Sequence, residues 1–113
     1  MAAMNFNQEQ FEKALLEERL PVLVEYWAPW CVYCRRIGPA LDALADQYRD
    51  QVQIVKINID DAPELAQQEQ IRLIPTLVYY HEGEARESIT APGSKAEIEN
   101  FLRQQLSQYR NFL

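Results

Sequence analysis

Short runs of apolar, β-forming residues alternate with segments of helical period, and this alternation most constrains the fold. The strand-like runs cover residues 22–27, 52–59, 77–80 and 85–90, the last two separated by a turn at 81–84. The first two runs are nearly continuous in apolar residues, which is typical of strands covered on both faces in a parallel sheet. Alternating strands and helices indicate βαβ units. The sequence therefore predicts an α/β fold, with a central mixed sheet, a final antiparallel hairpin and helices on both faces.

Four segments have the period of an amphipathic helix. They run from about residue 7 to 19, from near 31 to 48, from 61 onward and from 94 to 109. Asn7 is expected to act as the N-cap of the first segment, with Gln10 completing a capping box. Asp61 and Ser94 are expected to act as N-caps of the last two. Pro39 lies inside the second segment and is expected to kink that helix. The sequence shows no repeat, linker or composition shift, so residues 1–113 are predicted to form one domain.

Charge argues against nucleic acid and anionic membranes as partners. The chain has 11 Lys and Arg against 17 Asp and Glu, a net charge of −6, whereas a phosphate-binding surface needs the opposite balance. No apolar run approaches the roughly 20 residues of a membrane span. The first 20 residues include charges that the apolar region of a secretory signal does not tolerate. A cytoplasmic location is therefore expected.

The two cysteines, Cys31 and Cys34, stand at the junction between a predicted strand and a predicted helix. A disulfide between them would close so short a loop that it would add little stability, so a chemical role is favoured. The N–H groups and the dipole at a helix N-terminus favour a thiolate at Cys31. An exposed thiolate beside a deeper thiol can attack a disulfide and then be resolved.

Other interpretations of the two cysteines remain open at this point. A structural zinc site needs four ligands, and His81 is the one further candidate of suitable type, so no metal is predicted. Cluster ligation shared between two subunits would require a dimer. Two unreactive core cysteines are the simplest alternative. The strand–helix context favours a redox motif.

Several segments, in order and spacing, resemble the thioredoxin family over about residues 6–106. They are Val22-Leu23-Val24-Glu25-Tyr26-Trp27-Ala28-Pro29-Trp30-Cys31-x-x-Cys34, Lys56-Ile57-Asn58-Ile59-Asp60, Ile71-Arg72-x-Ile74-Pro75-Thr76-Leu77 and the Gly83 hairpin. The resemblance implies a thioredoxin fold, with Cys31 as nucleophile and Cys34 as resolving cysteine. It also implies that Pro75 is a cis-proline, that the Ile74 backbone pairs with substrate, and that Trp30 shields the thiols.

The resemblance further implies a thiol–disulfide oxidoreductase that carries electrons to disulfide-containing proteins. Its electrons would come from a separate thioredoxin-reductase-like donor, with no cofactor of its own, and the protein would act as a monomer. Two alternatives stand beside this hypothesis. One is a variant that works as an oxidant or isomerase. The other is a peptide-binding or chaperone module in which the cysteines are dispensable.

Glu25 is a carboxylate in an apolar strand, where burial should raise its pKa. A pKa near neutrality suits a base that takes the proton of Cys34 during resolution. Lys56, on the neighbouring predicted strand, is placed to pair with it. The alternatives are a side chain that reaches the strand edge and a purely structural ion pair. The resemblance favours the proton relay, although thioredoxins usually have Asp here. Glu followed by an aromatic residue and later by Ala-Pro-Trp-Cys looks more like protein disulfide isomerase domains.

Two dipeptides depart from the family pattern. Val32-Tyr33 stands where thioredoxins have Gly-Pro, a position that tunes the redox potential. The loss of Pro suggests a less reducing protein. Ala91-Pro92 replaces the usual Gly-Ala, and glycine there would let the backbone of a partner come close. An exposed apolar rim around the thiols is expected to bind substrate peptides. Its predicted members are Trp30, Val32, Tyr33, Ile74, Pro75 and Pro92.

Overall fold

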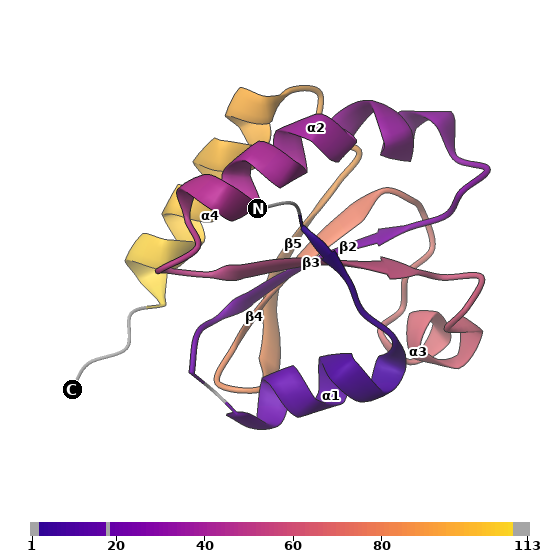
Figure 1. Ribbon diagram of the computed structural model, residues 1–113, viewed down its shortest axis with the longest axis horizontal. Helices are drawn as coiled ribbons and strands as arrows, with labels where there is room; N and C mark the ends of the chain where they lie inside the picture. The colour runs from indigo at the N-terminus through magenta and orange to yellow at the C-terminus, as the bar shows by residue number, and fades with distance from the viewer. Residues whose placement is uncertain (1–2, 18, 110–113) are drawn as a thin grey trace.

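The computed structural model describes residues 3–17 and 19–109. Its centre is a five-stranded sheet in the order β1-β3-β2-β4-β5 (Figure 1). The strands are β1 (Met4–Asn5), β2 (Val22–Trp27), β3 (Gln53–Asn58), β4 (Thr76–His81) and β5 (Glu84–Thr90). The helices are α1 (Gln8–Glu17), α2 (Val32–Gln47), α3 (Pro63–Gln68) and α4 (Lys95–Gln108). The α/β fold predicted from the sequence is confirmed.

The sheet is mixed, as expected. Strands β1 and β2 both run parallel to β3, β2 pairs with β4 antiparallel, and β4 and β5 form the antiparallel hairpin. The edge strand β1 was not predicted. It has two residues, paired with Val55 and Lys56, and two residues are too few to show a strand period in the sequence.

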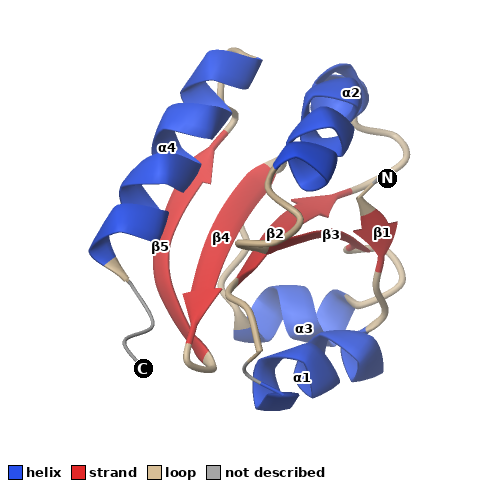
Figure 2. Ribbon diagram, turned by 60° about the vertical axis from the view of Figure 1, so that its left-hand side comes forward, coloured by secondary structure: helices blue, strands red, loops and turns tan. Residues whose placement is uncertain are grey.

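Helices cover both faces of the sheet (Figure 2). Helices α1 and α3 pack on one face around Phe11 and Leu65, and α2 and α4 pack on the other around Leu41 and Leu102. Strand β2 is buried on both faces, which accounts for its continuous apolar run. This double burial makes any ionisable side chain on β2 costly to charge.

The predicted caps hold at two helices. The Asn7 side chain accepts a hydrogen bond from the Gln10 N–H at 2.8 Å, and the Gln10 side chain accepts one from the Asn7 N–H at 2.9 Å. The Ser94 hydroxyl accepts from the Glu97 N–H at 3.1 Å and begins α4. Each interaction satisfies N–H groups that a helix N-terminus leaves without partners.

The prediction that Asp61 caps α3 is wrong. The N-cap is Ala62, which makes no side-chain hydrogen bond, and Pro63 is the first helical residue. Asp61 instead belongs to the turn that follows β3, where its N–H donates to the Asn58 carbonyl at 3.1 Å. The turn therefore displaces the helix start by one residue.

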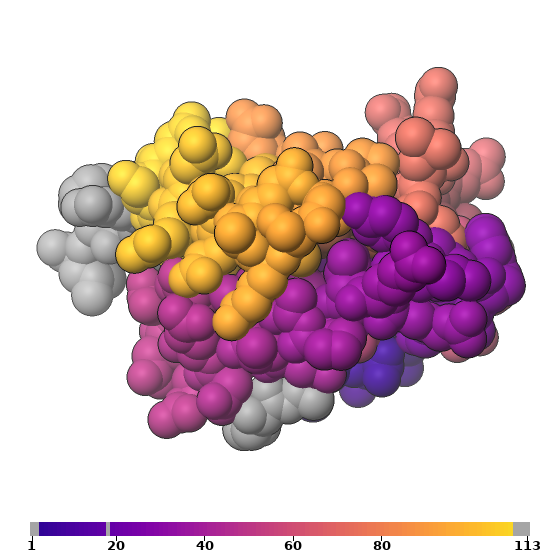
Figure 3. Space-filling view, turned by 90° about the horizontal axis from the view of Figure 1, so that it is seen from above, coloured from indigo at the N-terminus to yellow at the C-terminus, as the bar shows by residue number. Residues whose placement is uncertain are grey.

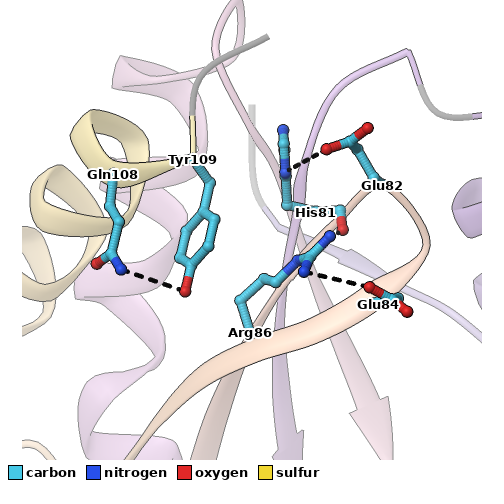
Figure 4. Close-up of polar contacts among 6 residues, drawn as sticks. All are labelled: His81, Glu82, Glu84, Arg86, Gln108 and Tyr109. Carbon is cyan, nitrogen blue, oxygen red and sulfur yellow. Dashed lines mark hydrogen bonds and ion pairs between the residues drawn. The ribbon is translucent and has the colours of Figure 1, made fainter.

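The C-terminal end of α4 is fixed to the β4–β5 hairpin (Figure 4). The Tyr109 ring lies 5.8 Å from the His81 ring, and the Arg86 guanidinium lies 5.5 Å from the centre of the Tyr109 ring. Arg86 also pairs with Glu84 at 3.2 Å. Because His81 aligns with the start of β2, this cluster occupies the end of the sheet opposite Cys31.

Candidate active site

Cys31 is the N-cap residue of α2, directly after the loop that leaves β2. Its N–H donates to the Ala28 carbonyl at 3.1 Å, a turn that places the sulfur over the helix start. The sulfur accepts a hydrogen bond from the Cys34 N–H at 3.2 Å. Both cysteines are free thiols. A negatively charged sulfur at Cys31 is therefore favoured by a direct N–H donor and by the helix dipole.

Cys31 is less accessible than the sequence suggested. The residue is 8% exposed and Cys34 is 2% exposed, so Cys31 is the outer of the two, but neither is open to solvent. The α3–β4 loop (residues 69–75) covers part of the sulfur, since Cys31 Sγ lies 4.0 Å from the Ile74 carbonyl oxygen. The peptide bond that follows, between Ile74 and Pro75, is cis.

The Cys34 thiol is set to keep its proton. Burial and the hydrogen bond with the Cys31 sulfur raise the pKa of the Cys34 thiol well above its ordinary value. The charge of Glu25 raises that pKa further, so the carboxylate and the thiol are close enough to interact. Cys34 can therefore act as a nucleophile only after a nearby base removes its proton.

Glu25 is 1% exposed, in the middle of β2. Burial raises the pKa of its carboxyl from 4.5 to about 7, while Lys56 lowers the pKa and Asp42 raises it by a smaller amount. Among the described residues, its Oε2 atom has no hydrogen-bond partner. The alternative in which this side chain escapes to the strand edge is therefore wrong. A buried carboxyl that titrates near neutrality is suited to take up and release a proton.

Lys56 lies beside Glu25 in the parallel register of β2 and β3, and both side chains point toward α2. Its Nζ atom is 3.8 Å from Asp42 Oδ1, and its charge also acts on Glu25, whose pKa it lowers. Asp42 was not identified from the sequence, where it looks like one of several charges on the polar side of a helix. The strand register that brings Lys56 under α2 has no local sequence pattern.

The six predicted rim residues differ in exposure. Trp30 and Val32 are 66% and 52% exposed, Tyr33 and Ile74 are half-buried, and Pro75 and Pro92 are buried. The prediction that both prolines are exposed is wrong. Pro75 leads directly into the buried strand β4. The Tyr33 hydroxyl donates to the Pro92 carbonyl at 2.7 Å, which holds the Tyr33 side chain against the loop between β5 and α4.

Two further residues contribute to the rim. Leu73 is 67% exposed, immediately before Ile74, and its apolar character in a loop was the available clue. Asp60 accepts a hydrogen bond from Trp30 Nε1 at 3.1 Å. This bond fixes the indole while its ring stays accessible, so Trp30 offers a flat apolar surface next to Cys31.

Within residues 3–17 and 19–109, no three His, Cys, Asp or Glu side chains are grouped so that they could hold a metal ion. The helices of the described chain include none with the length and apolarity to cross a membrane. The reactive and titratable groups gathered at the site are its two thiols, the carboxyl of Glu25 and the charges of Lys56 and Asp42.

Comparisons with known proteins agree with this geometry. The family model described as Thioredoxin matches residues 2–104. The chain is 42% identical to Thioredoxin 1 of Synechococcus elongatus over 96 residues, which cover 85% of this chain and 90% of the relative. It is 36% identical to the thioredoxin of Porphyra purpurea over 107 residues, 95% of this chain and all of the relative. It is 38% identical to the chloroplastic M-type thioredoxin of Spinacia oleracea over 101 residues, 89% of this chain and 56% of the relative.

The fold, the spacing of Cys31 and Cys34 and the extent of these matches agree over most of the chain. The cysteines meet at a helix N-terminus, and the apolar rim surrounds them. The chain belongs to the thioredoxin family and is a protein thiol–disulfide oxidoreductase.

Proposed function

We propose that this single-domain protein reduces the disulfides of other proteins, with Cys31 as the attacking nucleophile and Cys34 as the resolving thiol. The observation that carries the proposal is the hydrogen bond from the Cys34 N–H to the Cys31 sulfur at the start of α2. It stabilises charge on the outer sulfur, while burial keeps the inner one protonated.

The exchange proceeds in two steps. The Cys31 thiolate attacks one sulfur of the substrate disulfide, which breaks the substrate S–S bond, forms a mixed disulfide and releases the first substrate thiolate. The Cys34 thiolate then attacks the Cys31 sulfur and releases the second substrate thiolate. The substrate gains two electrons and, on protonation, two protons, and the protein is left with a Cys31–Cys34 disulfide.

Glu25 supports the second step as the base for Cys34. Its carboxyl has a pKa of about 7, so it is partly ionised at neutral pH and can accept the thiol proton. Lys56 is a positioning residue in this proposal, because its charge lowers the pKa of Glu25 and favours the ionised form. Asp42 opposes that effect, and so helps to keep the carboxyl near the point of half ionisation.

The proposed partners follow from the rim. Trp30, Val32 and the other rim residues would bind apolar segments of a protein substrate, and the backbone of Ile74 would pair with the segment that carries the attacked cysteine. A separate thioredoxin-reductase-like protein would return the two electrons. We further propose that the protein acts as a monomer in the cytoplasm. We also propose that it has no nucleic acid or membrane partner, because a net charge of −6 opposes binding to phosphate-rich surfaces.

Trapping the mixed disulfide tests the proposal. A Cys34→Ser variant incubated with a disulfide-containing protein such as insulin should accumulate a covalent complex through Cys31, measured by mass spectrometry under non-reducing conditions. The Cys31→Ser variant is the matched control and should form none. Full biological activity in a variant that lacks both cysteines would overturn the enzyme proposal in favour of a binding module.

The direction of exchange is tested by the equilibrium reduction potential of the Cys31–Cys34 pair. A general reductase should have a value near about −270 mV. A value above roughly −200 mV is typical of isomerases and oxidants and would contradict the proposed direction.

A further inference from the structure

The hydroxyl of Tyr33 joins two elements that border the active site. It donates a hydrogen bond to the Pro92 carbonyl at 2.7 Å and lies 3.4 Å from the Ala91 carbonyl oxygen. Tyr33 is in the first turn of α2, and the two carbonyls belong to the β5–α4 loop (residues 91–94). The space-filling view shows that loop (orange) directly against the N-terminal part of α2 (purple) (Figure 3).

The same loop is held from a second direction. The Ala91 N–H donates to the Pro75 carbonyl at 2.8 Å, so the loop is bonded to the entry of β4 as well as to α2. Ala91 has φ 47°, in the left-handed region that favours glycine. An alanine kept in that conformation indicates a loop whose shape is determined by the contacts around it.

The two sides of Cys31 therefore differ. Along the sheet order β3-β2-β4-β5, Trp30 and Asp60 lie toward β3, while Tyr33 and the β5–α4 loop lie toward β5. On the β3 side, Trp30 is 66% exposed and presents an open apolar ring. On the β5 side, Pro92 is buried, and the Tyr33 hydrogen bond joins the first turn of α2 to the β5–α4 loop.

We propose that Tyr33 determines which disulfides the site accepts, by holding the β5–α4 loop against α2. This proposal rests on the proposed function. One flank of the attacked substrate cysteine lies against the Tyr33–Pro92 contact and must carry small residues. The other flank lies against Trp30 and accepts large apolar ones.

Peptide disulfides of 5-thio-2-nitrobenzoate test this assignment. Three peptides would carry the cysteine between glycines, with Trp on its N-terminal side, or with Trp on its C-terminal side. Attack on the peptide sulfur releases the coloured thiolate, and its rate gives a second-order rate constant for each peptide. One of the two Trp peptides should react more slowly than the glycine peptide. The other Trp peptide should react at least as fast as the glycine peptide.

The Tyr33→Phe variant keeps the ring and removes the hydroxyl. The penalty on the disfavoured flank should fall about fivefold, the value of one hydrogen bond, while the other flank is unchanged. Ala91→Gly should act in the same direction, because glycine lets the loop adopt other conformations. Tyr48→Phe is the matched control: it removes a 2.6 Å hydrogen bond to Glu99, away from the site, and should leave the selectivity unchanged.

Equal rates for the two Trp peptides, or a flank preference that survives Tyr33→Phe without change, would overturn the assignment of Tyr33. If Tyr33→Phe slowed the reactions with all three peptides equally, that result would also contradict the assignment, because a purely structural role of Tyr33 would affect every peptide alike. No thiolate release from any peptide would refute the proposed function itself, and the outcomes therefore distinguish the two proposals.

Discussion

Glu25 and Tyr26 are neighbours in the middle of β2, and both are almost fully buried. They point to opposite faces of the sheet, Glu25 toward α2 and Tyr26 toward α1 and α3. The Tyr26 hydroxyl is 2.6 Å from the Tyr80 hydroxyl, which in turn donates to Glu69 Oε1 at 2.5 Å. By contrast, the Oε2 atom of Glu25 has no hydrogen-bond partner among the described residues.

The difference separates a buried polar group that keeps its proton from one that titrates near neutrality. Burial and the charge of Glu69 raise the pKa of the Tyr26 hydroxyl, so it stays protonated and serves as a permanent link in a hydrogen-bonded chain. Burial brings the pKa of Glu25 to about 7, so its charge changes under physiological conditions. A buried group whose hydrogen bonds are all made keeps one protonation state, whereas a partly satisfied carboxyl beside a thiol is a candidate for proton transfer.

The largest expected effect is on stability when Glu25 is replaced. The unfolded carboxyl ionises near pH 4.5 and the folded one near pH 7, so the folded state binds more protons between these values. Stability should therefore fall as pH rises through this window, by roughly 3 kcal/mol in total above it. Glu25→Gln should lack this fall, which urea unfolding of the reduced proteins at pH 4 and pH 8.5 measures.

A difference between wild type and Glu25→Gln that does not change with pH would show that Glu25 is not buried as a titrating acid. The comparison must be between the two proteins at each pH, because other carboxylates titrate in both.

Interrupting the hydrogen bonds that link Tyr26, Tyr80 and Glu69 should have the next largest effect on stability. Tyr80→Phe leaves the buried Tyr26 hydroxyl without its 2.6 Å partner, which should lower the free energy of unfolding by about 2 kcal/mol. The rate of disulfide exchange should stay the same, because these hydrogen bonds lie on the face of the sheet opposite Glu25. If Tyr80→Phe lowered the rate of disulfide exchange together with the free energy of unfolding, the two faces of the sheet would not have separate roles.

The smallest expected effects come from the charges beside Glu25. Asp42→Asn removes a negative charge that raises the pKa of Glu25, and Lys56→Met removes a positive charge that lowers it. The two variants should therefore shift the Glu25 titration in opposite directions, Asp42→Asn to lower pH and Lys56→Met to higher pH, as followed by carbon-13 NMR of the Glu25 carboxyl. Shifts in the same direction would contradict the assigned electrostatics.

Most of the fold could be predicted from patterns among residues that are close in the sequence. The apolar runs of β2 and β4, the Asn7–Gln10 capping box and the placement of Cys31 at a helix start depend on residues that are close in the chain. Such features are fixed by periodicity and by the hydrogen-bonding needs of helix ends. The burial of Glu25 could be predicted from the same patterns, because it lies in a strand with apolar residues on both sides.

Features set by distant contacts could not be predicted. Asp42 reaches Lys56 only through the packing of α2 on β3, and Pro92 is buried in a loop to which Tyr33 bonds from another element. Strand β1 exists because Met4 pairs with Val55, far along the chain. Each depends on tertiary geometry, for which neighbouring residues give no pattern.

The central claim, that Glu25 removes the proton of Cys34 during resolution, has a direct kinetic test. When reduced protein is mixed rapidly with saturating 5,5′-dithiobis(2-nitrobenzoate), the first thiolate released reports attack by Cys31, and the second reports resolution by Cys34. In the wild type the rate of the second release should rise with pH and level off above about pH 7, where the Glu25 carboxyl is ionised. In Glu25→Gln it should be slower by about a hundredfold at neutral pH, with no inflection there. Superimposable profiles for the two proteins would contradict the claim.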